Sequence, residues 1–253
     1  MAQPLTPEEF SRELYAIRDA YHTKDHPFFL LWGEGKLTLK QMGVYMIQHL
    51  LHVEDIFQAL GITYSRAPME VRHFIIENLS EEHGIMALEE ERDAVDHFES
   101  IRRFIYHVGF GPEDIVEDHA YWWTRARVRS FYDVALREPW PVFLAMLFTL
   151  ESQEVGVNSR VVPAMIQHYG FRAGDPVIRF FEEHYLADQE HGRRTLELVT
   201  KYATDRPTQD RCLKVAEEGC QYKWAYVEEI YQRSRSEHPF AWTRPVKPTP
   251  STP

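Results

Sequence analysis

Three polar side chains with metal-ligand chemistry lie close together in FFEEHYLADQEHGRR, residues 180–194. His184, Asp188 and His191 are spaced by four and three residues, so on an α-helix they share one face. The apolar neighbours in this segment indicate that the face looks inward. Two imidazoles and a carboxylate suit a divalent first-row metal ion. The alternative is a solvated polar face, because such spacings also arise by chance in a chain with 13 histidines.

Further acids and imidazoles occur elsewhere in the chain. Glu151 follows a mostly apolar run in PVFLAMLFTLESQEV, and a buried carboxylate must be paired, protonated or bound to a metal. The alternative is that Glu151 begins a polar surface turn. Helical bundles build two-metal carboxylate sites from glutamates and histidines on facing helices. The other candidates for such a site are Glu54, Glu82, Glu90 and His97.

The elements that must position these residues are helices. Apolar residues recur every three or four positions, and no segment alternates with the period of a strand. The pattern predicts a single all-α bundle of about eight helices, formed by residues 1–242. The Pro- and Thr-rich tail 243–253 is expected to be disordered. The predicted helices are 6–23, 37–68, 69–84, 96–111, 119–138, 139–171, 174–203 and 207–235.

Composition excludes several classes of protein. The net charge of −11 over 253 residues argues against binding to nucleic acid or to an anionic membrane surface. The residues MAQPLTPEEFSREL lack the basic and apolar regions of a signal peptide, so none is expected, and no apolar run is long enough to span a bilayer. Cys212 and Cys220, eight residues apart on one predicted helix, would be separated by roughly 12 Å, too far for a disulfide. Reduced thiols predict a cytoplasmic protein.

With these segments placed, the chain resembles a known family over residues 26–197. The matching segments include HPFFLLWGEGKLTLKQMGVYMIQHLLHVEDIF, LESQEVGVNSRVVPAMIQHYGF and FFEEHYLADQEHG. They are similar to the heme-oxygenase-like di-iron oxidases, which are relatives of the pyrroloquinoline-quinone biosynthesis oxidase and of the TenA thiaminases. The resemblance implies a heme-oxygenase-like, TenA-like helical bundle.

The resemblance also implies a ligand set. The glutamate of ESQ, Glu151, corresponds to the bridging carboxylate, and the HxxxDxxH pattern corresponds to His184, Asp188 and His191. The histidine that opens a helix after a loop corresponds to His97.

The remaining acidic ligand has two candidates. The family pattern NLxxE falls on Glu82, whereas Glu90 has the usual family spacing to His97. We prefer Glu82 because the preceding ENLS also matches. Glu54 corresponds to a further glutamate that some members carry on the second helix. The branch that makes para-aminobenzoate has a functional lysine ten residues after the ESQ glutamate. Val161 occupies that position here, which argues against the self-sacrificing chemistry of that branch.

The function implied is that of a non-heme di-iron oxidase or oxygenase. It would hold two irons, with manganese as the alternative metal, use dioxygen and a small organic substrate, need no organic cofactor, and form a homodimer. One alternative is a cofactor-independent oxidase of the quinone-biosynthesis type on the same fold. The other is a non-catalytic helical interaction protein, suggested by the aromatic pair Trp122 and Trp123, which cannot both face inward.

The choice between the two acidic candidates is testable. We expect Glu82→Ala to reduce metal binding more than Glu90→Ala, because loss of a ligand costs more than loss of a solvated carboxylate. Metal content per chain after anaerobic Fe(II) loading measures the difference. The opposite ranking would move the ligand into the segment between the two helices.

Overall fold

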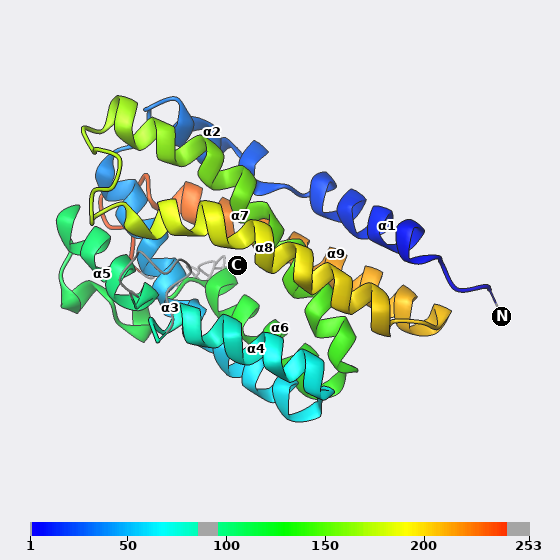
Figure 1. Cartoon of the computed structure of the whole chain (residues 1–253). Helices are drawn as coiled ribbons and strands as arrows, with labels where there is room; N and C mark the ends of the chain where they lie inside the picture. Colours follow the sequence, from blue (N-terminus) through cyan, green and yellow to red (C-terminus); the bar gives the residue numbers. More distant parts are fainter. Residues whose placement is uncertain (1, 86–95, 242–253) are drawn as a thin grey trace, which may run out of the picture.

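The structure, a computed structural model, describes residues 2–85 and 96–241, without the side chains of residues 186–190. The described part of the chain is all-α, as predicted (Figure 1). Its α-helices are α1 (Pro7–Ala20), α2 (Pro27–Gly33), α3 (Leu39–Arg66), α4 (Met69–Glu82), α5 (His97–His107), α6 (Trp122–Arg137), α7 (Trp140–His168), α8 (Arg179–Tyr202) and α9 (Arg206–Arg233). Short 3-10 helices cover Thr23–Asp25, Pro112–Asp114 and Glu117–His119. The tail 243–253 lies outside the described residues, so its disorder stays a prediction.

Helix α2 was not among the eight helices predicted from periodicity. Seven residues are too few for a clear amphipathic pattern. The helix begins because the His26 Nδ1 accepts a hydrogen bond from the N–H of Phe28 at 3.1 Å, and Pro27 occupies the first helical position. Burial of Phe28 and Trp32 then stabilises a helix too short to persist alone.

Two helix ends fix the residues of greatest interest. Helix α5 begins at His97 because the Asp96 carboxylate accepts hydrogen bonds from the N–H groups of Phe98 at 2.8 Å and Glu99 at 3.3 Å. Helix α4 ends at Glu82, and Gly84 then adopts a φ of 65°, while the N–H of Ile85 donates to the Ser80 carbonyl at 2.8 Å and so caps the helix end. Both ends therefore present a titratable side chain at the end of a helix.

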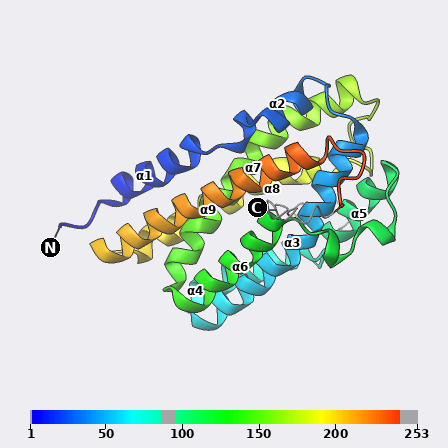
Figure 2. The ribbon, with the colours of Figure 1, turned by 180° about the vertical axis from the view of Figure 1, so that it is seen from behind.

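Helix α7 is the centre of the bundle. Its residues 141–150 are all buried, as expected of a helix covered on every side. It packs along α8 and α9, while α1 lies beside α9 (Figures 1 and 2). Helices α3, α4 and α6 form a neighbouring group, in which α3 contacts both α4 and α6. Phe143, Met146 and Phe148 belong to the apolar core.

The Trp122–Trp123 pair and the two cysteines lie in the environments expected of them. Trp122 is 59% exposed, whereas Trp123 packs against the core, so the pair does divide between solvent and interior. Cys212 and Cys220 are buried free thiols. No helix within the described ranges is long and apolar enough to cross a membrane.

Burial of neutral histidines makes stability depend on pH. His22 is 5% exposed, and burial, aided by the charges of Lys223 and Lys24, lowers its pKa to about 3. The unfolded chain therefore binds a proton near pH 6.5 that the folded chain refuses, so stability is present above pH 6.5 and is lost as pH falls towards 3.

We expect His22→Asn to remove about 1 kcal/mol of the stability difference between pH 7.0 and pH 5.5. Urea unfolding at the two pH values measures this. His73→Asn, at an exposed position on α4, is the matched control and should leave the difference unchanged. Equal pH dependence in His22→Asn and the unmodified protein would contradict the explanation.

Candidate metal centre and cavity

Glu82, His97 and His184 converge inside the bundle. One ligand atom from each lies within 4.8 Å of the other two. They come from the end of α4, the start of α5 and the second turn of α8, respectively. His97 is buried, whereas Glu82 and His184 are partly buried. One carboxylate and two imidazoles form a nitrogen and oxygen donor set suited to first-row metal ions.

The cluster carries an ion pair. His97 Nδ1 donates a hydrogen bond to Glu82 Oε2. Burial alone would raise the pKa of Glu82, but the His97 charge and hydrogen bond outweigh it and lower that pKa to about 2. Burial likewise opposes a charge on His97, yet Glu82 raises the pKa of the imidazole above its usual value. The lowered pKa of Glu82 and the raised pKa of His97 both favour the ion pair between these two side chains.

His184 is held in a form that can bind a metal. Its Nδ1–H donates a hydrogen bond to the carbonyl oxygen of Phe180 at 2.8 Å, so Nε2 of the neutral ring keeps its lone pair. Burial, followed by the charge of His97, lowers the pKa of His184 to about 4. Such a backbone contact fixes the ring orientation and the tautomer of a ligand before any metal arrives.

His191 faces α4 in a separate pair. Its Nε2–H donates to Glu81 Oε2 at 2.6 Å, and its Nδ1 accepts a hydrogen bond from the Asn78 amide at 3.2 Å. Burial lowers the pKa of His191, but the Glu81 hydrogen bond and the nearby acids raise it above its usual value. Glu81 and Glu82 both lie in the last turn of α4, where the helix dipole disfavours carboxylates. The two histidines compensate that cost.

Glu151 lies on α7 and lines the same cavity as Glu82 and His184. Its Oε2 is enclosed and has no hydrogen-bond partner. Burial, helped by Glu82 and Glu154, raises the pKa of Glu151 to about 7. An enclosed carboxylate oxygen without a donor is costly, and a metal ion would satisfy it.

The other predicted ligands are not brought to this cluster by the described structure. Glu54 is exposed, whereas its neighbours His52 and Val53 line the cavity, so Glu54 projects away from it. The Asp188 side chain and all of Glu90 lie outside the described residues. The structure therefore places Glu82 beside His97 and leaves the comparison with Glu90 to experiment.

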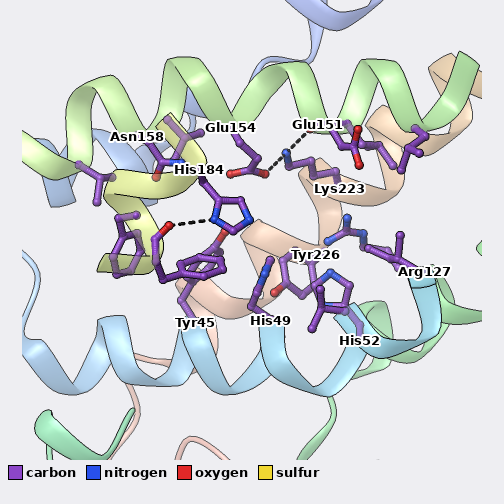
Figure 3. A pocket seen from close by; sticks show the side chains of 18 of the residues that line it. Tyr45, His49, His52, Arg127, Glu151, Glu154, Asn158, His184, Lys223 and Tyr226 are labelled. Atoms are coloured by element: carbon purple, nitrogen blue, oxygen red, sulfur yellow. Dashed lines mark hydrogen bonds and ion pairs between the residues drawn. The ribbon is translucent and has the colours of Figure 1, made fainter. Parts of the chain in front are cut away.

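A cavity of about 90 Å³ adjoins the cluster (Figure 3). Most of its wall is apolar, and it is bounded by residues from α2, α3, α4, α6, α7, α8 and α9. Lys223 Nζ crosses from α9 to donate to Glu154 Oε1 at 2.5 Å and to the Leu150 carbonyl at 2.9 Å. Besides the acids and imidazole already described, the polar groups of the wall are Tyr45, His49, His52, Arg127, Glu154, Asn158, Lys223 and Tyr226.

Sequence reasoning missed several of these groups. Glu154 follows Glu151 by three residues, and that spacing could have placed it on the same helix face. Glu81 was passed over because Glu82 matched the family pattern. Arg127 and Lys223 lie in charged, seemingly solvated helices, so only tertiary packing reveals that each is at most 5% exposed.

The residues present fit a metal ion. Ligand atoms around one first-row ion at about 2.1 Å lie about 3 to 4.2 Å apart, so the cluster needs only a small closing movement. Glu82, His97 and His184 would hold one ion, and the unpartnered oxygen of Glu151 lies beside the same space. A second ion would need Glu151 with His191 and Asp188.

Solved structures establish the type of fold. A TenA homologue from Pseudomonas syringae matches with a TM-score of 0.75 at 12% identity, covering 92% of this chain and 98% of that one. A domain with a heme oxygenase-like fold from Shewanella denitrificans matches with a TM-score of 0.74 at 15% identity, covering 95% and 99%. The predicted heme-oxygenase-like, TenA-like bundle is confirmed.

Sequence relatives cover most of the chain. A protein named 4-aminobenzoate synthase from Chlamydia muridarum is 24% identical over 224 residues, covering 88% of this chain and 90% of the relative. A protein of the same name from Nitrosomonas europaea is 24% identical over 233 residues, covering 88% and 91%. The family model for iron-containing redox enzymes matches residues 44–224, which span the cluster and most of the cavity wall. The chain therefore belongs to the family of iron-containing redox enzymes.

Proposed function

We propose that the protein is a non-heme di-iron oxidase that activates dioxygen to oxidise a small organic substrate. The observation that carries this proposal is the convergence of Glu82, His97 and His184 within 4.8 Å beside a largely apolar cavity. Membership of an iron-containing redox family supports iron as the metal. The resemblance described above supports two ions, completed by Glu151, Asp188 and His191.

The residues of the chain would act by positioning and by excluding water. Bound iron would supply the site for dioxygen and the electrons that reduce it. His184 would bind through Nε2, because its Nδ1–H is committed to the Phe180 carbonyl. Glu82 and Glu151 would lower the net charge of the centre. The apolar walls, including Phe57 and Phe180, would keep bulk water from the reacting atoms.

The relatives named 4-aminobenzoate synthase suggest one reaction, but this chain differs at a relevant position. Val161 stands where that branch carries its functional lysine, and it is fully buried on the cavity wall. The wall does contain a lysine, Lys223, but its ammonium is already engaged by Glu154 and the Leu150 carbonyl. We therefore propose oxidation of a separate small molecule rather than of the chain itself.

A cofactor-independent oxidase on the same fold is the second candidate. One observation favours it: Glu82 pairs with His97, and Glu81 with His191, so these groups have partners without a metal. The enclosed, unpartnered oxygen of Glu151 favours the di-iron proposal instead. Metal content separates the two candidates.

Substitution of the cluster residues tests the metal proposal. We expect His184→Ala, Glu151→Ala and His191→Ala each to abolish Fe(II) loading at one or both sites while the helical content stays close to normal, because each removes a ligand. Inductively coupled plasma analysis after anaerobic loading, with circular dichroism for the fold, measures both. Glu77→Gln is the control, since Glu77 lies on α4 and pairs with Arg194 on α8. If a variant still binds two irons per chain, the substituted residue is not a ligand.

Reaction with dioxygen tests the activity. We expect protein loaded with two Fe(II) per chain to consume dioxygen on stopped-flow mixing and to give a visible absorbance that decays faster with the right substrate. His184→Ala should lose this absorbance. Protein that stays free of metal after anaerobic loading, yet oxidises a substrate, would support the cofactor-independent alternative.

A further inference from the structure

Arg127 is a buried cation without a counter-ion. It lies on α6, is 5% exposed and lines the cavity. Its Nε has no hydrogen-bond partner, and among the described residues no carboxylate forms an ion pair with it. A guanidinium carries five N–H donors and stays charged, so burying it unpaired is costly. Such a cost is commonly retained where a ligand supplies the missing charge.

The guanidinium of Arg127 lies beside two aromatic rings that also line the cavity. Its guanidinium carbon lies 4.7 Å from the ring centre of Tyr226 and 5.6 Å from that of Phe131. The Tyr226 hydroxyl is also buried without a hydrogen-bond partner. Arg127 and Tyr226 lie near each other in the close view of the cavity, with His52 beside them (Figure 3). Two unsatisfied donors therefore occur together in one part of the cavity wall.

This donor pair is connected to the candidate metal centre by a row of packed rings. His52 contacts Tyr226 at a centroid distance of 5.2 Å and His49 at 5.1 Å. His49 in turn contacts Phe180 at 5.3 Å, and Phe180 packs on His184 at 4.1 Å. A molecule held at Arg127 would therefore extend along this wall towards the metal ligands.

Among the described residues of the wall, the other cationic side chain already has an acidic partner, whereas Arg127 has none. Lys223 is neutralised by Glu154, and Glu82 is paired with His97. Burial lowers the pKa of His49 to about 3 and that of His52 well below its usual value, so both rings stay neutral. Arg127 remains as the one uncompensated cation among the described lining residues. Glu151 also has a carboxylate oxygen without a partner, and it lies with the candidate metal ligands, where a bound metal ion would satisfy it. The carboxylate of a monoanionic ligand would then pair with Arg127.

We propose that the cavity binds a small monocarboxylic acid, whose carboxylate pairs with Arg127 and accepts a hydrogen bond from the Tyr226 hydroxyl. The inference names the substrate class of the site and so rests on the proposed function. The apolar body of the acid packs against Val53, Phe131 and Leu147 and reaches towards His184. Arg–carboxylate pairs are short, charge-assisted and often bidentate, which gives both affinity and orientation.

Calorimetric titration with matched probes tests this assignment. We expect hexanoate to bind at least about tenfold more tightly than hexanamide, which has the same shape without the charge, and hexylammonium not to bind. Arg127→Gln should remove this preference, and Tyr226→Phe should weaken hexanoate binding several-fold. Arg129→Gln, at an exposed position two residues along α6, is the matched control and should bind as the unmodified protein does. Equal binding of hexanoate and hexanamide, or a preference that survives Arg127→Gln, would overturn the proposal.

Stability supplies a second readout. Because Arg127 lacks a counter-ion in the free protein, Arg127→Met should leave the melting temperature without ligand equal or higher. Hexanoate should raise the melting temperature of the unmodified protein and not that of Arg127→Met. If Arg127→Met strongly lowers the melting temperature and hexanoate does not raise that of the unmodified protein, Arg127 has a purely structural role and the proposal is wrong. Acetate binding as tightly as hexanoate would indicate an adventitious ion only and would also overturn the proposal.

The two proposals fail separately. The titrations are run on metal-free protein and again on Fe(II)-loaded protein without oxygen. A carboxylate that binds only as an iron ligand would bind the loaded protein and not the metal-free protein. Arg127-dependent binding in protein that never loads iron would leave this inference standing and remove the di-iron proposal. Normal iron loading with no carboxylate preference would do the reverse.

Discussion

The compensation of buried charge is the constraint on which the structure depends. Glu82 pairs with His97, Glu81 with His191, and Glu154 with Lys223, and each pair is largely removed from water. The pairs join α4 to α5, α4 to α8, and α7 to α9, so the contacts that hold the candidate site also hold the helices. Breaking such a pair by removing one partner typically costs about 3 to 5 kcal/mol. The acids can therefore stay ionised inside an apolar bundle, ready for a metal.

Much of the fold could be predicted from the sequence. Periodicity alone indicated the long helices, because α3, α7 and α9 are 28 or 29 residues long and repeat buried apolar residues along their length. Helix α2 was missed because its stability comes from a His26 cap and from tertiary packing. The end of α4 was indicated by Gly84, because glycine adopts a positive φ freely and commonly follows a helix end; the helix itself ends two residues earlier, at Glu82.

The site was predictable only where residues share a helix or a recognisable pattern. His184 was predicted from its spacing to Asp188 and His191, and His97 from the family pattern; the structure brings both to Glu82. Glu54 was predicted as a ligand from the family resemblance, and it lies on the same helix as His49 and His52. It occupies a different face of that helix and is exposed to solvent, whereas His49 and His52 line the cavity. Arg127 carries no sequence signal, because a guanidinium on an amphipathic helix is normally solvated, and its burial depends on how α6 meets α3 and α9. The cavity that results has the candidate metal ligands in one part and the cation of Arg127 in another.

An iron-edge anomalous diffraction map of crystals loaded anaerobically with Fe(II) tests the central claim most directly. We predict a peak bounded by Glu82, His97 and His184, with a second about 3.5 to 4 Å away beside Glu151. Peaks confined to surface carboxylates, or a cluster that keeps its Glu82–His97 pair with no iron density between the three side chains, would contradict the account.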